Sequence, residues 1–166
     1  MAIDIGMGAL DRPSYGAIGV NTCIHLGNPA NATGVLNSFE VYANTNLSGL
    51  KMGSFSGSGK SWAVRDYVTI GAVKSGSKQT FTGIECSVVY LDCLGTYFSN
   101  YGSIERTSSG GQGILWKAGD HFSAGTITYS ASSSCDDSYY ATGISAQPAR
   151  KRMGGVPHAS MQKGVW

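Results

Sequence analysis

Apolar and polar residues alternate in short runs along most of the chain, a pattern that predicts strands and not helices. In Val35–Ala43, residues Val35, Phe39 and Val41 are apolar, and Leu36 breaks the alternation. Turn-forming Gly, Asn, Asp and Pro separate the runs. The expected strands are Val35–Ala43, Trp62–Val73, Lys78–Gly83, Ile84–Leu91, Cys93–Phe98, Ile114–Lys117, Thr126–Ala131 and Tyr139–Ala146.

Many short strands separated by turn signals predict an all-β fold, a β-sandwich of the jelly-roll type. Residues 14–146 are expected to form this single sandwich domain. Residues 1–13 show no clean period and lead into the turn-prone Asp11–Ser14, so they are expected to form a short N-terminal arm.

Residues 147–166 differ in composition from the rest. They carry four basic residues and no acidic one, whereas residues 1–146 carry eight Lys/Arg and ten Asp/Glu. Two prolines and a Gly-Gly pair disfavour a helix, so an extended C-terminal arm is expected. We expect the arm to dock onto another protein, with the basic cluster steering and the apolar residues anchoring. The residues expected to dock are Arg150, Lys151, Arg152, Met153, Val156, Val165 and Trp166.

The composition favours a subunit that packs beside others. Charged residues make up 13% of the 166 residues, against a usual share of about 25%, and the net charge is +2. Such a surface resists self-association poorly. Four basic residues would neutralise few phosphates, so a nucleic-acid partner is not expected. No apolar run approaches the ~18 residues of a membrane span, and Asp4 stands where a secretory signal would be basic and then apolar.

The segment Gly57–Ser61 reads GSGKS, like the end of a phosphate-binding loop. The full motif needs a glycine where Ser54 stands, and it needs a helix after the loop to hold the phosphates. The residues that follow are strand-like, so a hairpin loop is the expected structure.

Neither the cysteines nor the histidines have the spacing of a metal site. The four cysteines are predicted to be buried thiols, with a disulfide as the less favoured interpretation. They are Cys23, Cys86, Cys93 and Cys135.

The acidic residues leave two weaker alternatives open. Asp136 and Asp137 are adjacent, as in some Ca²⁺ sites, and a glycosidase would need two carboxylates that converge in a cleft. The candidates for such a pair are Glu85, Asp92 and Glu105. Nothing in their spacing singles them out, so no catalytic residue, metal or cofactor is expected.

Aromatic residues leave a further alternative open. They would either form a sugar-stacking platform or fill the core of the sandwich, and the core is favoured. They are Trp62, Tyr97, Phe98, Tyr101, Trp116, Tyr139 and Tyr140.

Four strings together carry a resemblance to a known group. They are Asn28–Ala43, Ile70–Gly83, Leu94–Asp120 and Arg150–Trp166. Nearly the whole chain resembles β-rich structural proteins of tailed bacteriophages and prophages, among them decoration, head-fibre and tail-associated proteins. The resemblance implies a virion setting and attaches no catalytic residues.

The leading hypothesis is therefore a non-enzymatic virion protein, a capsid decoration or a head or tail accessory subunit. It would assemble in the cytoplasm of the bacterial host as a homo-oligomer, such as a trimer, and its partner would be the major capsid protein or a tail protein. The alternative is a carbohydrate-binding module of a receptor-binding or adhesive protein.

Overall fold

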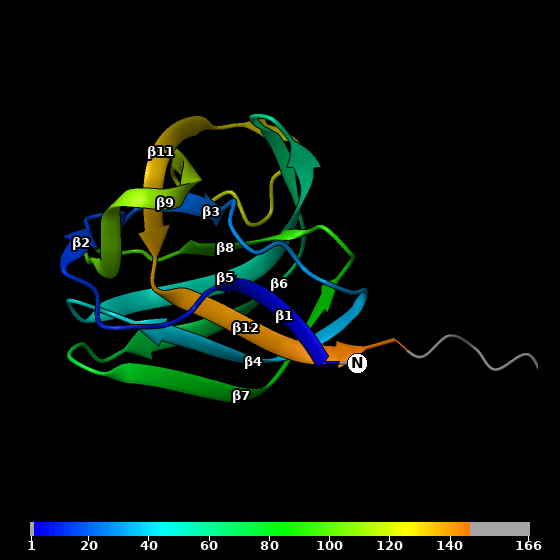
Figure 1. Ribbon diagram of the computed structural model, residues 1–166, viewed down its shortest axis with the longest axis horizontal. Coiled ribbons are helices and arrows are strands. Elements are labelled where there is room, and N and C mark those ends of the chain that lie inside the picture. Colours follow the sequence, from blue (N-terminus) through cyan, green and yellow to red (C-terminus); the bar gives the residue numbers. More distant parts are fainter. Residues whose placement is uncertain (1, 147–166) are drawn as a thin grey trace, which may run out of the picture.

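The computed structural model describes residues 2–146, which form twelve β-strands and no helix (Figure 1). The prediction of an all-β sandwich is therefore confirmed. In this part of the chain no helix is long and apolar enough to cross a bilayer.

One sheet has four strands, and every neighbouring pair is antiparallel. Its order is β1 (Ala2–Met7), β12 (Tyr139–Ser145), β4 (Gly34–Tyr42) and β7 (Lys78–Val88). The first and last described strands thus lie side by side, and Ala2 pairs with Ile144.

The second sheet has eight strands. Its order is β10 (Ile127–Thr128), β6 (Ser61–Val73), β5 (Leu47–Ser58), β8 (Cys93–Tyr97), β3 (Asn21–His25), β9 (Ile104–Ala118) and β11 (Ser130–Asp137), with β2 (Ser14–Gly16) paired to β9. The chain changes sheet at most connections: β1, β4, β7 and β12 belong to the first sheet, and the strands between them to the second.

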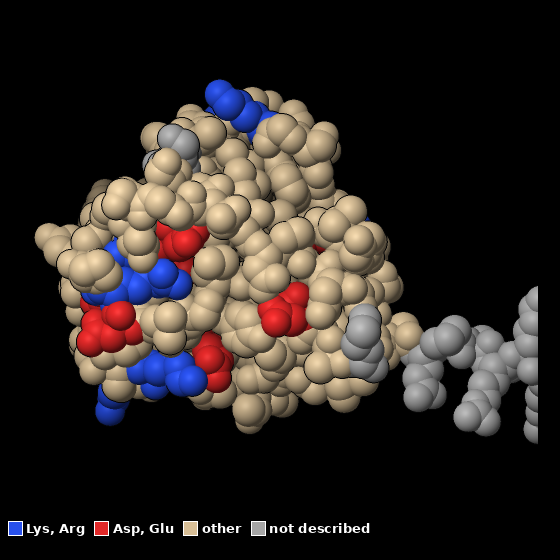
Figure 2. Space-filling view, in the orientation of Figure 1, with Lys and Arg blue, Asp and Glu red and all other residues tan. Residues whose placement is uncertain are grey.

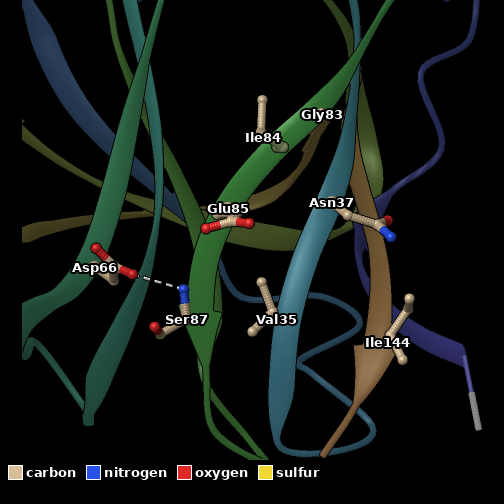
Figure 3. Close-up of a pocket in the computed structure, with 8 residues that line it drawn as sticks. All are labelled: Val35, Asn37, Asp66, Gly83, Ile84, Glu85, Ser87 and Ile144. Atoms are coloured by element: carbon tan, nitrogen blue, oxygen red, sulfur yellow. Dashed lines mark hydrogen bonds between the residues drawn. The ribbon is translucent and has the colours of Figure 1, made fainter.

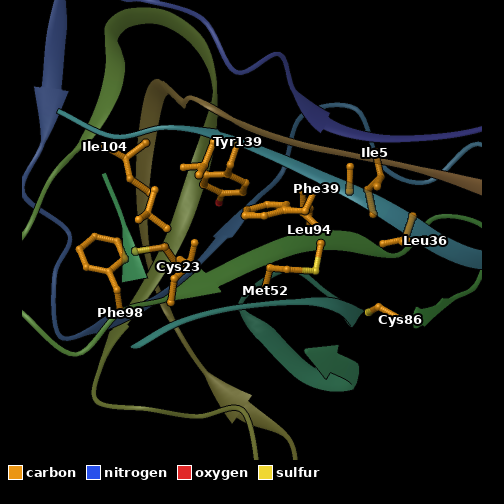
Figure 4. Packing of buried hydrophobic residues seen from close by; sticks show 14 of the residues in the cluster. Ile5, Cys23, Leu36, Phe39, Met52, Cys86, Leu94, Phe98, Ile104 and Tyr139 are labelled. Atoms are coloured by element: carbon orange, nitrogen blue, oxygen red, sulfur yellow. The ribbon is translucent and has the colours of Figure 1, made fainter. Parts of the chain in front are cut away.

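The main core lies between the two sheets (Figure 4). Phe39 and Tyr139 of the four-stranded sheet, and Met52 and Leu94 of the eight-stranded sheet, are all fully buried there. Because successive side chains of a strand point to opposite faces, the main core takes only every second residue of each strand, the residues that face the other sheet. The hydrophobic effect of this burial holds the two sheets together.

A second apolar cluster covers part of the other face of the eight-stranded sheet. In β3, Cys23 belongs to the main core, and its neighbour Ile24 belongs to this second cluster. Phe55 and Phe122 meet there edge to face, with ring centroids 5.2 Å apart. Burial on both faces explains why β3 and the middle of β5 are almost continuously buried.

The expected N-terminal arm over residues 1–13 is wrong. Ala2–Met7 form β1, which pairs with β12 along its whole length, and Ile3 and Ile5 are fully buried in the main core. The sandwich therefore begins at the first described residues and not at residue 14. The predicted C-terminal arm, residues 147–166, lies outside the described residues.

Most of the expected strands form, with changed boundaries. Lys78–Gly83 and Ile84–Leu91 belong to one strand, β7, which ends at Val88. Thr126–Ala131 is divided between β10 and β11. Strands β2, β3 and β5 were not predicted, and of β9 only Ile114–Lys117 was predicted.

The Gly57–Ser61 segment forms the expected hairpin. Strand β5 ends at Ser58 and β6 begins at Ser61, with Gly59 in the left-handed region at φ +57°. The Trp62 Nε1–H donates a hydrogen bond to the Gly59 carbonyl oxygen (3.1 Å). No helix follows the loop, so the arrangement that a phosphate-binding loop needs is missing from this hairpin.

Candidate functional site

A hollow of about 560 Å³ opens on the outer face of the four-stranded sheet, beside its edge strand β7 (Figure 3). Four of the sandwich's strands contribute to it, from both sheets. It is lined by Val35 and Asn37 of β4, Gly83, Ile84, Glu85 and Ser87 of β7, Ile144 of β12, and Asp66 of β6.

Irregular pairing of β4 and β7 accompanies the hollow. Leu36 pairs with Cys86 and Ser38 with Thr82, so three residues of β7 lie opposite the single residue Asn37. Gly83, the first of the three, has φ +72°, a backbone conformation that favours glycine. Bulges of this kind bend a strand and redirect its side chains.

The apolar part of the hollow consists of aliphatic side chains. Val35 and Ile144 pair across β4 and β12, and they are 42% and 64% exposed. Ile84 lies on the opposite wall and is partly buried against the main core. Single exposed apolar residues are ordinary on protein surfaces, and the adjacent Val35 and Ile144 side chains together form a small aliphatic patch beside the hollow.

The polar part of the hollow is acidic. The Asp66 carboxylate accepts hydrogen bonds from the backbone N–H groups of Ser87 (2.6 Å) and Tyr67 (2.9 Å), which ties β6 to β7 (Figure 3). The side chain of the exposed Glu85 makes no hydrogen bond or ion pair with any other residue in 2–146. The site thus offers one carboxylate held by the backbone and one that is free to meet a cation.

Further exposed apolar residues lie at the same end of the sheet. The loop after β7 exposes Tyr90 and Leu91. The Tyr90 N–H donates to Thr33 Oγ1 (3.0 Å), and the Ala146 N–H donates to the Thr33 carbonyl oxygen (2.9 Å). The last described residues therefore lie beside both the hollow and this loop.

Elsewhere, charged side chains are sparse. On the face seen in Figure 2 they are few, and uncharged residues cover most of the surface. Arg65 pairs with the buried Asp92, and Lys78 pairs with Glu40 on the outer face of the four-stranded sheet.

A second group of chemistry-bearing residues is buried between β3, β9 and β11. The Nε2 atom of His25 lies 3.1 Å from Asp136 Oδ1, an ion-pair distance without the alignment of a hydrogen bond. Burial lowers the pKa of His25, against the opposing effects of Asp137 and Asp136. Burial also raises the pKa of the nearby Cys23 thiol well above its ordinary value. A neutral imidazole and a protonated thiol without solvent access do not make an activated nucleophile.

The alternatives raised by the acidic residues find little geometric support. Asp136 accepts a hydrogen bond from the Gln112 N–H (2.7 Å), and Asp137 is bound by Arg106. Across residues 2–146 no group of three or more His, Cys, Asp or Glu side chains could hold a metal ion. Of the three glycosidase candidates, Asp92 is bound by Arg65 and Glu105 by Asn44, which leaves Glu85 alone in the hollow. Asp66, its neighbour there, already binds two backbone amides.

The aromatic residues are divided between core and surface. Phe98 and Tyr139 are fully buried and Trp62 nearly so, as the core interpretation predicts. Tyr101 is 91% exposed and Trp116 41% exposed. Because Phe98 is buried, the segment from Tyr97 to Tyr101 does not form an outward row.

The prediction of buried thiols is confirmed. Cys23, Cys86, Cys93 and Cys135 are all buried, and none of them forms a disulfide. Burial raises the pKa of Cys86 to about 11 and that of Cys93 to about 12.

The residues predicted to dock, from Arg150 to Trp166, lie outside the described residues, and the structure does not place them. The hollow was not predicted from the sequence. Two signals for it were present: the broken alternation at Leu36 and the glycine at position 83 within a strand-like run. Comparison with protein-family models and with curated proteins gives no match.

Proposed function

We propose that this chain is a non-enzymatic structural subunit of a tailed-phage virion, a capsid decoration or a head or tail accessory protein. It docks on the major capsid protein or a tail protein through residues 147–166 and assembles as a homo-oligomer. The resemblance of its sequence to phage structural proteins supports the virion setting.

The strand order supports the jelly-roll form of the sandwich. In chain order, β1, β4, β7 and β12 alternate with β3, the β5–β6 pair and β8, and the two groups form two facing sheets ordered β1-β12-β4-β7 and β3-β8-β5-β6. This is the arrangement expected of eight strands folded as two Greek keys. Strands β9 and β11 then extend the second sheet beyond β3. Jelly rolls occur in viral capsid proteins and in lectins, so the fold alone does not choose between the two hypotheses.

The observation that carries the proposal is the exposed Val35–Ile144 pair in the hollow. A sugar site is typically built around exposed aromatic rings that stack on the sugar face, and this hollow has aliphatic and acidic walls instead. Such a surface suits a protein segment that brings apolar and basic side chains.

Mass spectrometry of purified phage particles tests the proposal. A decoration protein is expected at many copies per particle and a tail fitting at few. Deletion of residues 147–166 should leave the sandwich folded and remove it from particles. Absence of the intact protein from washed particles would overturn the virion role, and normal occupancy of the deletion variant would overturn docking through this segment.

A carbohydrate-binding module remains the second candidate because of one observation. The exposed Trp116 lines a smaller hollow of about 240 Å³ with Asn21 and Arg106. A glycan array with the assembled protein and with Trp116→Ala tests this function. Binding that the variant loses would support it, and the absence of binding by the unaltered protein would exclude it for the glycans displayed.

A further inference from the structure

We propose that the hollow on the outer face of the four-stranded sheet binds the segment of its own chain that follows it, residues 147–166. The same segment cannot occupy the hollow and dock on a virion protein at once, so the intramolecular contact belongs to the free subunit, and docking on a partner would release it. The contact does not depend on where a virion places the protein.

The last described residues lie beside the hollow. Ile144 forms one wall of the hollow, and Ala146 is hydrogen-bonded to Thr33 at the same end of the sheet. Strand β7, which carries Glu85, lies two strands away from β12, about 10 Å at the usual strand spacing of ~4.8 Å. Along the strands, Glu85 lies opposite Asn37, about four residues or ~13 Å from the level of Thr33 and Ala146, so the full separation is about 16 Å. Five to six extended residues span about 16–20 Å, so Lys151 and Arg152 can reach the far wall.

The charges of the hollow and of residues 147–166 are opposite in sign. The hollow holds two carboxylates, Asp66 and Glu85, and no Lys or Arg. The nearest cations along the chain and the sheet are already engaged, Arg65 by Asp92 and Lys78 by Glu40. Residues 147–166 contain four basic residues and no acidic one, with three of the four consecutive at 150–152. An acidic site without a cation of its own is complementary to such a segment.

The hollow and residues 147–166 both offer apolar side chains next to their charges. The exposed Val35 and Ile144 side chains form an aliphatic patch beside the carboxylates. In the segment, Met153 and Val156 follow directly after the basic cluster. A segment that meets Glu85 through its basic residues therefore brings apolar side chains to the patch within a few residues.

We favour residues 147–166 of the same chain as the occupant of the hollow, over those of a second copy, because the segment follows directly after Ala146. A tethered segment that can reach its site experiences an effective concentration in the millimolar range. A second copy would have to compete at its own, lower concentration.

Trypsin provides the test, because it cleaves after the basic residues at 150–152. The full chain and a synthetic peptide of residues 147–166 are digested briefly, and cleavage at these positions is followed by intact mass. We expect slower cleavage in the full chain than in the peptide, at a rate that does not change with protein concentration. We expect Glu85→Gln to raise the rate about two- to fivefold, the range for loss of an exposed ion pair. Ile144→Ser should raise it as well.

Asp11→Asn is the matched control. Asp11 is an exposed acid on the loop before β2, and the same charge is removed without a new trypsin site. Its cleavage rate should equal that of the unaltered chain. Cleavage of the full chain as fast as the peptide would overturn the proposal, as would equal effects of Asp11→Asn and Glu85→Gln. Protection that grows with protein concentration would overturn the intramolecular contact in favour of a second copy. None of these results depends on particles, so they are distinguishable from failure of the virion role.

Discussion

Arg106 and Asp137 form a two-pronged ion pair between β9 and β11. The distances are 2.6 Å from Nε to Oδ1 and 3.3 Å from Nη2 to Oδ2. The Asp137 side chain is fully buried, and that of Arg106 is 17% exposed. The pair joins β9 and β11, the two strands that extend the eight-stranded sheet beyond β3. Asp137 lies two residues before Tyr139, where β12 begins.

Asp137→Ala should destabilise the fold by about 3–5 kcal/mol, because it leaves the Arg106 guanidinium largely buried without a counter-charge. Urea unfolding followed by circular dichroism measures the change in the free energy of unfolding. Asp11→Ala, at an exposed acid, should change it by no more than about 0.5 kcal/mol. Equal small losses in the two variants would show that the buried pair does not stabilise the fold.

Leu36→Ala and Val35→Ala should differ sharply in stability. Leu36 is fully buried in the main core, and Val35 faces the hollow. Truncation of a buried leucine typically costs about 2–5 kcal/mol, whereas the exposed valine should cost less than about 1 kcal/mol. The same unfolding measurement compares them. A larger loss for Val35→Ala would mean that the strand presents its other face to the core.

The same two residues show how far the sequence could predict this fold. In the sequence, Val35, Phe39 and Val41 follow the alternation and Leu36 breaks it. The structure exchanges the first two residues: Leu36 points inward with Phe39 and Val41, and Val35 points out, because the irregularity at Asn37 shifts the alternation by one residue. Period-2 reasoning assigns faces correctly only where the pairing is regular.

Other strands that were not predicted from the sequence also have identifiable causes. Strand β5 contains three glycines and four serines in its twelve residues, so its propensity is poor, and pairing with β6 and β8 on both sides determines its structure. In β1, Ile3 and Ile5 do alternate with Ala2 and Asp4, but the run is short, and its partner β12 lies at the far end of the described chain. The hollow arises from residues on four strands, so the local signals at Leu36 and Gly83 indicate an irregular pairing but do not predict the hollow itself.

The cysteines should resist thiol reagents until the protein unfolds. Cys86 and Cys93 are buried, and burial raises their pKa to about 11 and about 12, so the reactive thiolate is scarce at pH 8. A colorimetric thiol assay should report almost no rapid reaction in buffer and four thiols per chain in denaturant. Above about pH 8.5 the unfolded thiols ionise and the folded ones do not, so stability should fall as the pH rises. Rapid labelling of the native protein would contradict the burial of these side chains.

His25 should make the fold sensitive to mild acid. Burial lowers its pKa in the folded protein, while in the unfolded chain the ordinary value is about 6.5. As the pH falls below about 6.5, the unfolded chain takes up a proton that the folded protein does not, so the free energy of unfolding decreases. The decrease is at most about 1.4 kcal/mol per pH unit for one group, and it ends below the folded pKa. Urea unfolding at several pH values between about 5.5 and 7 should therefore give a steeper dependence for the unaltered protein than for His25→Gln. Carboxyl groups ordinarily titrate below this window, so the difference in slope between the two proteins reports the imidazole. Equal slopes would show that the histidine gains its proton as readily in the folded protein as in the unfolded chain.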